Sequence, residues 1–153
     1  MKLVVKNGFL QNQDQKYKCS IGYNGLNKNK NEGDGCTPIG TFKINKILYR
    51  PDKINIHRFN IESEVIEKKH GWCDDINSDS YNQKIEFPFE QSAEHLHRND
   101  DLYDIICVID YNLNPIVKGK GSAIFLHVVR DDYSPTQGCI AIKKDELLQI
   151  AHN

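Results

Sequence analysis

The chain has 153 residues, of which 39% are hydrophobic and 27% are charged, and its 20 basic and 21 acidic side chains leave a formal net charge of −1. A chain of this length is expected to form one domain, residues 1–153, that buries about 68 to 70% of the surface of its unfolded form. The balanced charge argues against nucleic acid as a partner, and no apolar stretch is long enough to span a membrane.

The first third of the chain reads as short strands separated by turns. Residues 3–5 and 16–21 are predicted to be two strands linked through Asn7 and Gly8. Residues 24–35 are rich in Asn, Lys and Gly, which predicts a flexible, solvated loop whose lysines need not have a function. A tight turn is expected at 37–40, followed by a bent strand or hairpin at 41–49 that Pro51 ends.

The middle of the chain, residues 52–101, is the least regular part, with a weak helical period only at 92–96. Segments of this kind often line or cover a site. Trp72, with Asp74 and Asp75 close behind it, is therefore predicted to form part of a substrate-binding wall. The alternative is that Trp72 fills the core and the two aspartates cap a turn.

The last third is more regular. Residues 103–110 are predicted to be a buried strand, 112–115 a turn, 123–129 and 139–142 two further strands, and 143–151 a short closing helix with acidic residues early in it. The chain as a whole is therefore expected to be a mainly β, sandwich-like or barrel-like domain with few short helices.

Residues 124–142 carry the strongest candidate for catalysis. If the two strands of this stretch pair as a hairpin, the thiol of Cys139 lies beside the imidazole of His127, which would lower the pKa of the thiol from about 8.5 and make it a nucleophile. Gly138 lets the backbone turn sharply and expose N–H groups that can hold an oxyanion. This pattern indicates a cysteine acyltransferase, the alternative being that His127 and Cys139 are core residues.

A metal site is the competing interpretation of the same residue types. His70 and Cys73 stand at HxxC spacing, and His95 and His97 at HxH spacing. Zinc needs four convergent ligands, however, and these come from separate segments without a paired CxxC, so we expect no metal. The five cysteines are an odd number at irregular spacings, which predicts at least one free thiol rather than a disulfide framework.

Three short sequence elements resemble those of the YkuD-type L,D-transpeptidase family. FLHV at 125–128 and TQGC at 136–139 are similar to its active-site histidine and its Ser/Thr-x-Gly-Cys element, and TPIGTF at 37–42 is similar to its TPxGxF turn. The stretches LYRPD, GWCDD, LYD and GSAIFLHV resemble a compact branch of the family. The resemblance thus covers nearly the whole chain.

The resemblance implies a reaction without a cofactor on peptidoglycan stem peptides, in cell wall biogenesis and the maintenance of cell shape. Cys139 would form an acyl-enzyme, His127 would act as the base, Gly138 would shape the oxyanion site, and carbapenem-type inhibitors would acylate Cys139. Two alternatives remain open, namely hydrolysis alone, as an L,D-carboxypeptidase or amidase, and a non-catalytic cell-wall-binding module.

The chain departs from the usual family pattern at two positions. It has Gln137 where many members carry His before the Gly, and Ala141 where many carry an arginine that holds a substrate carboxylate. Other cations are therefore expected to hold the substrate carboxylate, and Asp74 and Asp75 its amine. The candidate substrate-binding residues are Arg130, Arg50, Thr136, Gln137, Trp72 and Tyr103.

The family function implies a location in the periplasm or at the cell wall. The N-terminal stretch MKLVVKNGF, however, contains only a short apolar run before Lys6, too short for the hydrophobic region of a signal peptide. A cytoplasmic location is the alternative expectation.

Overall fold

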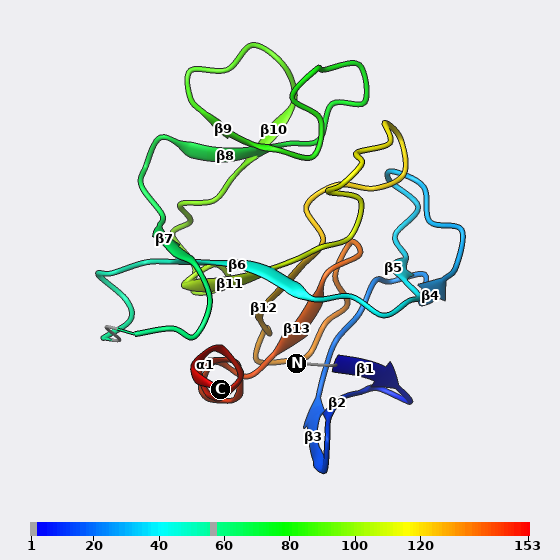
Figure 1. Cartoon of the computed structure of the whole chain (residues 1–153), viewed down its shortest axis with the longest axis vertical. Coiled ribbons are helices and arrows are strands. Elements are labelled where there is room, and N and C mark those ends of the chain that lie inside the picture. Colours follow the sequence, from blue (N-terminus) through cyan, green and yellow to red (C-terminus); the bar gives the residue numbers. More distant parts are fainter. Residues whose placement is uncertain (1–2, 56–57) are drawn as a thin grey trace.

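The computed structural model describes residues 3–55 and 58–153. In this described part the chain forms thirteen short strands and one helix, which confirms the mainly β fold expected from the sequence (Figure 1). None of the described helical structure is long and apolar enough to cross a membrane. The elements are β1 (Leu3–Lys6), β2 (Phe9–Asn12), β3 (Gln15–Lys18), β4 (Leu26–Asn27), β5 (Thr37–Pro38), β6 (Ile44–Tyr49), β7 (Ser63–Val65), β8 (His70–Cys73), β9 (Lys84–Glu86), β10 (Ala93–His95), β11 (Ile105–Ile109), β12 (Phe125–Val128), β13 (Ile140–Ile142) and α1 (Lys144–His152).

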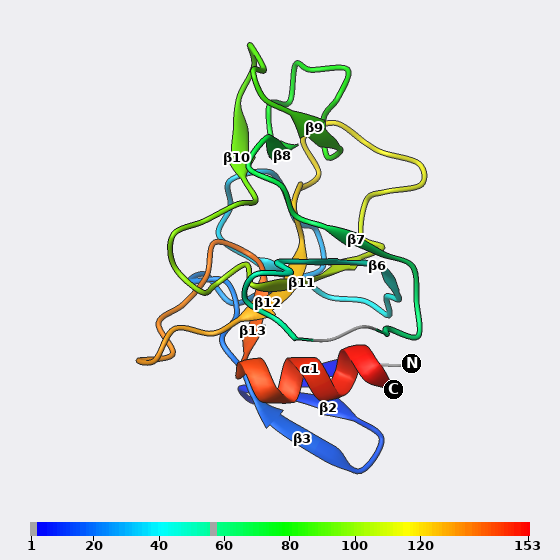
Figure 2. The same cartoon turned by 90° about the vertical axis from the view of Figure 1, so that its left-hand side faces the viewer.

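A five-stranded sheet in the order β13-β12-β11-β6-β7 divides the interior into two cores. Side chains alternate across it with a period of two, so that Ile105 and Cys107 of β11 point into one core while Ile106 and Val108 point into the other. Figures 1 and 2 show α1 and the β1–β3 meander on one side of this sheet and the small sheet β10-β8-β9 on the other. The second core, next to β8–β10, is the one that borders the functional site described below.

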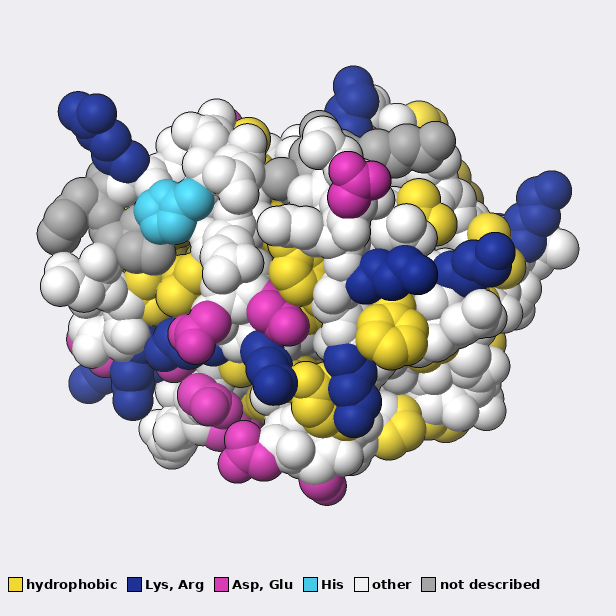
Figure 3. Space-filling view, turned by 90° about the horizontal axis from the view of Figure 1, so that it is seen from below, with side chains coloured by type: hydrophobic (Ala, Val, Ile, Leu, Met, Phe, Trp, Pro, Cys, Tyr) yellow, Lys and Arg dark blue, Asp and Glu magenta, His cyan; other side chains and the backbone are white. Residues whose placement is uncertain are grey.

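The helix α1 closes the first core. Asp145 and Glu146 lie in its first turn, where negative charge suits the positive end of the helix dipole. Leu147, Ile150 and Ala151 are buried against the sheet, and burying a leucine or isoleucine contributes about 1.5 to 3 kcal/mol. On the face that α1 and the meander form, basic, acidic and apolar side chains are interspersed (Figure 3).

The strands β12 and β13 are parallel neighbours and not the hairpin suggested by the sequence. Their register pairs His127 with Ala141 and Val128 with Ile142. Parallel neighbours need a connection of about a dozen residues, and the polar loop 129–139 has that reach. Because Cys139 stands two positions before Ala141, its side chain still falls on the same face of the sheet as the His127 side chain.

The outer edge of β13 is covered by the segment after β3. Ser20 and Ala141 exchange two backbone hydrogen bonds, each of 2.9 Å, and the backbone N–H of Thr136 donates to the carbonyl oxygen of Ile21 at 2.9 Å. The N-terminal part of the chain therefore contacts both the strand β13 and the loop that carries the TQGC element.

Three local expectations were wrong. The N-terminal strands number three, because β2 pairs with both β1 and β3. The weak helical period at 92–96 does not produce a helix, because Ala93–His95 form strand β10 and their backbone pairing with β8 outweighs that period. The segment 24–35 is not simply a solvated loop, since Leu26 pairs with Thr37 and Lys30 is only 3% exposed.

Candidate active site

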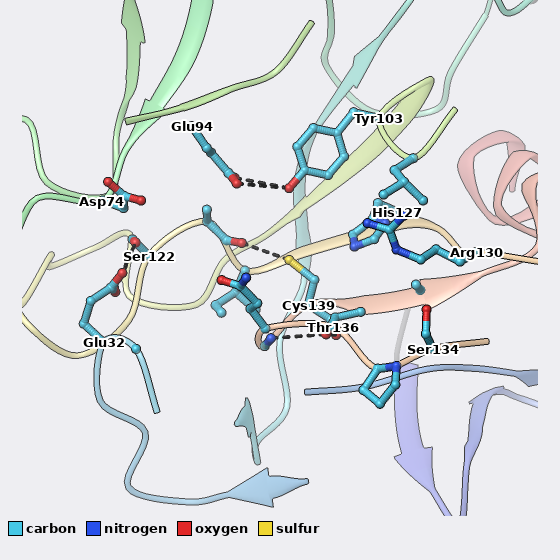
Figure 4. Close-up of a pocket in the computed structure, with 18 of the residues that line it drawn as sticks. Glu32, Asp74, Glu94, Tyr103, Ser122, His127, Arg130, Ser134, Thr136 and Cys139 are labelled. Carbon is cyan, nitrogen blue, oxygen red and sulfur yellow. Dashed lines mark hydrogen bonds between the residues drawn. The ribbon is translucent and has the colours of Figure 1, made fainter. Parts of the chain in front are cut away.

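A cavity of about 320 Å³ opens at the start of β13. The sequence-predicted residues Cys139, His127, Gly138 and Thr136 all line it. Figure 4 shows Glu32, Asp74 and Glu94 on one side of the Cys139 sulfur and His127 with Arg130 on the other. The cavity thus has an acidic wall and a basic wall with a thiol between them.

The thiol of Cys139 is half-buried at the floor of this cavity, whereas the other four cysteines are buried, and all five are free. Its Sγ–H donates to the carbonyl oxygen of Ala123 at 3.1 Å, and its Sγ accepts from the backbone N–H of Phe125 at 3.4 Å. Burial and the nearby Glu94 carboxyl raise the pKa of Cys139 to about 12. The sequence argument that His127 lowers this pKa is therefore wrong for the resting site, where the thiol is neutral at pH 7.

His127 is buried on β12, with its imidazole beside the Cys139 sulfur (Figure 4). Its Nδ1 lies 2.8 Å from the carbonyl oxygen of Val128. Because a carbonyl only accepts, Nδ1 carries the proton and Nε2 keeps a lone pair. Burial lowers the pKa of His127 to about 4, with smaller contributions from Arg98 and Arg130. At neutral pH the imidazole is uncharged and can accept a proton.

Two threonine hydroxyls hold the backbone of the Gly138–Cys139 pair. Thr37, from the TPIGTF turn, donates to the carbonyl oxygen of Gly138 at 2.8 Å, and Thr136 donates to that of Cys139 at 2.6 Å while accepting from the N–H of Gly138 at 3.1 Å. In a trans peptide the N–H points opposite to the carbonyl, so the N–H of Cys139 points away from Thr37. That N–H is a candidate donor to an oxyanion.

Gly138 has to be a glycine for steric reasons. Its φ of 149° lies in the region that side-chain-bearing residues rarely adopt. A Cβ there would also lie 2.9 Å from the carbonyl oxygen of Cys36. The two family-like motifs, at 37–42 and at 136–139, are therefore packed directly against each other.

Tyr103 lies next to His127 and is hydrogen-bonded to Glu94 of the acidic wall. The Tyr103 hydroxyl donates to the Glu94 carboxyl, with distances of 3.2 Å to Oε1 and 3.3 Å to Oε2. Burial raises the pKa of Glu94 to about 7, although the hydrogen bond from Tyr103 opposes that shift. Burial and Glu94 also keep the pKa of Tyr103 well above its usual value, so the phenol stays protonated.

The predicted substrate-binding residues divide into two groups. Arg130, Gln137, Thr136, Tyr103 and Asp74 line the cavity. The other predicted residues do not line it: Trp72, Arg50 and Asp75.

Trp72 lies beneath the site as a core residue. It is 7% exposed, its Nε1–H donates to Asn82 Oδ1 at 2.9 Å, and its ring meets that of Phe125 edge-on at 5.1 Å. The alternative that Trp72 fills the core is the correct one. Asp75 accepts from the backbone N–H of Asn77 and so stabilises a turn.

Arg50 is also buried and does not reach the cavity. Its guanidinium binds the Asp52 carboxylate with two hydrogen bonds of 2.7 and 2.6 Å and donates to the carbonyl oxygen of Arg98 at 2.9 Å. These contacts hold Asp52 and the backbone at Arg98, and Arg50 does not line the cavity.

The sequence analysis missed four charged residues that line the cavity: Lys30, Glu32, Glu94 and Arg98. Their segments looked like polar loops. The one sequence signal was the spacing of four residues between opposite charges, at Lys30 and Asp34 and at Glu94 and Arg98. Lys30 does pair with Asp34, with Nζ 2.8 Å from Oδ1.

The candidate metal ligands do not converge. Across residues 3–55 and 58–153, no group of three or more His, Cys, Asp or Glu side chains is arranged to hold a metal ion. His70 Nδ1 accepts from the N–H of Glu67 at 3.0 Å, and His95 stacks on Phe87 at 4.0 Å.

Comparison with protein families gives one match that spans the chain. The model of the YkuD family, described as an L,D-transpeptidase catalytic domain, matches residues 2–153. No curated protein and no solved structure gives a match.

Proposed function

Because its residues 2–153 match that model, the chain belongs to the YkuD family of L,D-transpeptidase catalytic domains, and we propose that it transfers peptidoglycan stem peptides through an acyl-enzyme on Cys139. One observation carries the proposal: the half-buried thiol of Cys139 and a neutral imidazole whose Nε2 is unprotonated both border the same cavity. This is the pairing of nucleophile and base that acyl transfer requires.

The first step forms a thioester. Nε2 of His127 takes the proton of Cys139 as the sulfur attacks the carbonyl carbon that follows an L-residue of the stem. The carbonyl oxygen becomes an oxyanion, for which the N–H of Cys139 is a donor. When the C–N bond breaks, the imidazolium returns the proton to the leaving amine of the D-residue.

The second step releases the acyl group. An amine of another stem peptide attacks the thioester carbon, His127 takes a proton from that amine, and the Cys139 thiolate leaves and is reprotonated by His127. The product is a cross-link. Water in place of the amine would give a shortened stem, so the acceptor decides between transpeptidation and hydrolysis.

The charges of the cavity suit a substrate of this class. Stem peptides carry carboxylates and, in many cases, a side-chain amine. Arg130 on the basic wall is a candidate partner for a carboxylate, and Asp74 and Glu94 on the acidic wall for the amine. In this proposal Arg130 takes the role of the family arginine, because the position of that arginine is occupied here by Ala141, which is only 1% exposed.

The test is muropeptide analysis of isolated sacculi incubated with the wild-type protein, with Cys139→Ala, and with Cys19→Ala as a control that removes a core thiol. We expect new cross-linked dimers with the wild type and with Cys19→Ala only. Shortened monomers without dimers would show that the protein hydrolyses stem peptides and does not cross-link them. Unchanged muropeptides with the wild type would refute catalysis and support a binding module.

A further inference from the structure

Lys30 is a buried cation in a segment that looks like a solvated loop. Its side chain is 3% exposed, and its Nζ lies 2.8 Å from Asp34 Oδ1 and 3.4 Å from the carbonyl oxygen of Asn31. Removing an ammonium group from water is costly unless it is well paired. The position of Lys30 therefore calls for a physical reason beyond loop solubility.

The side chain of Lys30 runs between two glycines toward the catalytic element. A Cβ at Gly121 would lie 2.9 Å from Lys30 Cε, and a Cβ at Gly138 would lie 3.3 Å from Lys30 Nζ. Both glycines have φ values, 111° and 149°, that disfavour other residues. The ammonium thus lies against the backbone of the residue that precedes the nucleophile, and Lys30 also lines the cavity.

The ion pair with Asp34 leaves Lys30 with a donor for a further contact. The Asp34 carboxylate also accepts from the backbone N–H groups of Asn31 and Cys36, at 2.8 and 2.9 Å, so its negative charge is shared among several donors. An ammonium has three N–H donors, and within the described part of the chain Nζ has two partners, Asp34 and Asn31. One donor remains for a group that enters the cavity.

On the premise of the acyl transfer proposed above, we infer that Lys30 is a catalytic residue whose ammonium stabilises the oxyanion formed on the substrate carbonyl, together with the N–H of Cys139. The resting thiol and imidazole are both neutral, so negative charge on the substrate develops only during the reaction. A fixed cation next to Gly138 then interacts more strongly with the transition state than with the bound substrate, which is the condition for raising the rate. No proton leaves Lys30 in this role.

Two reactions of Cys139 separate this role from a structural one. Acylation by a carbapenem passes through an oxyanion, whereas alkylation by iodoacetamide does not. For Lys30→Met we expect the acylation rate to fall by about 10²- to 10³-fold, the loss typical of removing an oxyanion donor, and the alkylation rate to change less than about threefold. Intact-protein mass spectrometry over time measures both rates on the same sample.

Two further variants control for the ion pair and for folding. Asp34→Asn removes the carboxylate but keeps the cation, so its acylation should stay within about threefold of wild type. Lys30→Gln keeps length and hydrogen-bonding capacity without charge, and should lose acylation as Lys30→Met does. Thermal unfolding identifies any variant that fails to fold.

The inference is overturned if Lys30→Met and Lys30→Gln acylate like the wild type, or if Asp34→Asn loses as much as they do. It is also overturned if acylation and alkylation fall together, because Lys30 would then act on the thiol or on the fold. A wild type that reacts with neither carbapenem nor muropeptides would instead remove the proposed function itself.

Discussion

The ring of Tyr103 lies edge-on to the imidazole of His127, with ring centroids 5.4 Å apart and planes at 75°. The hydroxyl of the same tyrosine donates to Glu94, so one side chain contacts both the candidate base and a carboxyl whose pKa is about 7. The position of the base is therefore linked through Tyr103 to a group that titrates near neutral pH.

Glu94 makes the stability of the protein depend on pH. The pKa of a glutamate is ordinarily about 4.5, whereas the pKa of Glu94 in the folded protein is about 7. The folded state therefore holds a proton that the unfolded state loses between these pH values, and this contribution is full below pH 4.5 and lost as pH rises to 7. We expect Glu94→Gln, which cannot ionise, to gain on the wild type by up to about 3 kcal/mol between pH 5 and pH 8.

Thermal unfolding at pH 5 and pH 8 measures this gain. Glu90→Gln, on an exposed residue, is the matched control and should keep a constant difference from the wild type. A constant difference for Glu94→Gln as well would mean that Glu94 is ionised in the folded protein throughout this range.

Replacing His127 by Asn should lower the rate of Cys139 acylation by about 10² to 10⁴ because the proton acceptor is lost while a polar side chain of similar size remains. The rate of carbapenem adduct formation is the measurement. His95→Asn is the control, since His95 stacks on Phe87 and does not line the cavity. A near-normal rate for His127→Asn would assign the base to another group.

The low pKa of His127 predicts an unusual acid limit for the reaction. A protonated imidazole cannot accept the thiol proton, so the acylation rate should fall as pH drops through about 4. The measurement is best made in the Glu94→Gln variant, because the Glu94 carboxyl, with its pKa of about 7, would otherwise titrate in the same pH range. A fall centred near pH 6.5 would show that His127 is more exposed to water in solution than in this structure.

Cys139 should be alkylated before the other four cysteines. Burial raises the pKa of Cys19 to about 11 and of Cys107 to about 12, and Cys139 shares this high pKa. Its advantage is access and an adjacent base, because it alone is partly exposed. Limited treatment with iodoacetamide at pH 6.5, followed by peptide mapping, gives the order in which the cysteines react. Earlier reaction of Cys36 or Cys73 would mean that one of these residues, and not Cys139, is the nucleophile.

Arg130 is the exposed cation of the basic wall, while Arg98 is already bound by Asp100 through two hydrogen bonds of 2.8 and 2.6 Å. A charge-assisted contact to a substrate carboxylate is worth about 1.5 to 3 kcal/mol. We expect Arg130→Ala to raise KM for muropeptides by at least about tenfold and to leave alkylation of Cys139 unchanged. Arg58→Ala is the matched control. Equal kinetics for both variants would mean that Arg98, and not Arg130, binds the substrate carboxylate.

The sequence predicted those features that depend on local pattern. A continuous apolar run identified the strand that became β11, alternating side chains identified β12, and the TQGC element identified Cys139 with its preceding glycine. The helix α1 followed from its acidic first turn and its apolar face. Each of these signals is contained within about ten consecutive residues.

Features that depend on contacts between distant segments were not predictable in this way. Nothing within residues 24–35 shows that Lys30 passes between Gly121 and Gly138, about a hundred positions away. The high pKa of Cys139 arises because distant segments of the second core bury it and because Glu94 lies nearby. Likewise, whether β12 and β13 pair as a hairpin or in parallel depends on the path that the loop 129–139 takes from the end of β12 to the start of β13.

The backbone pairing of Ser20 with Ala141 has a consequence for solubility. As the outer strand of its sheet, β13 would otherwise offer unpaired N–H and C=O groups, the usual template for edge-to-edge association between molecules. Ser20, in the segment after β3, hydrogen-bonds to the N–H and C=O of Ala141 and so protects the edge of the strand that follows the nucleophile. A chain that lost its first twenty or so residues would expose this edge beside Cys139 and would be prone to self-associate there.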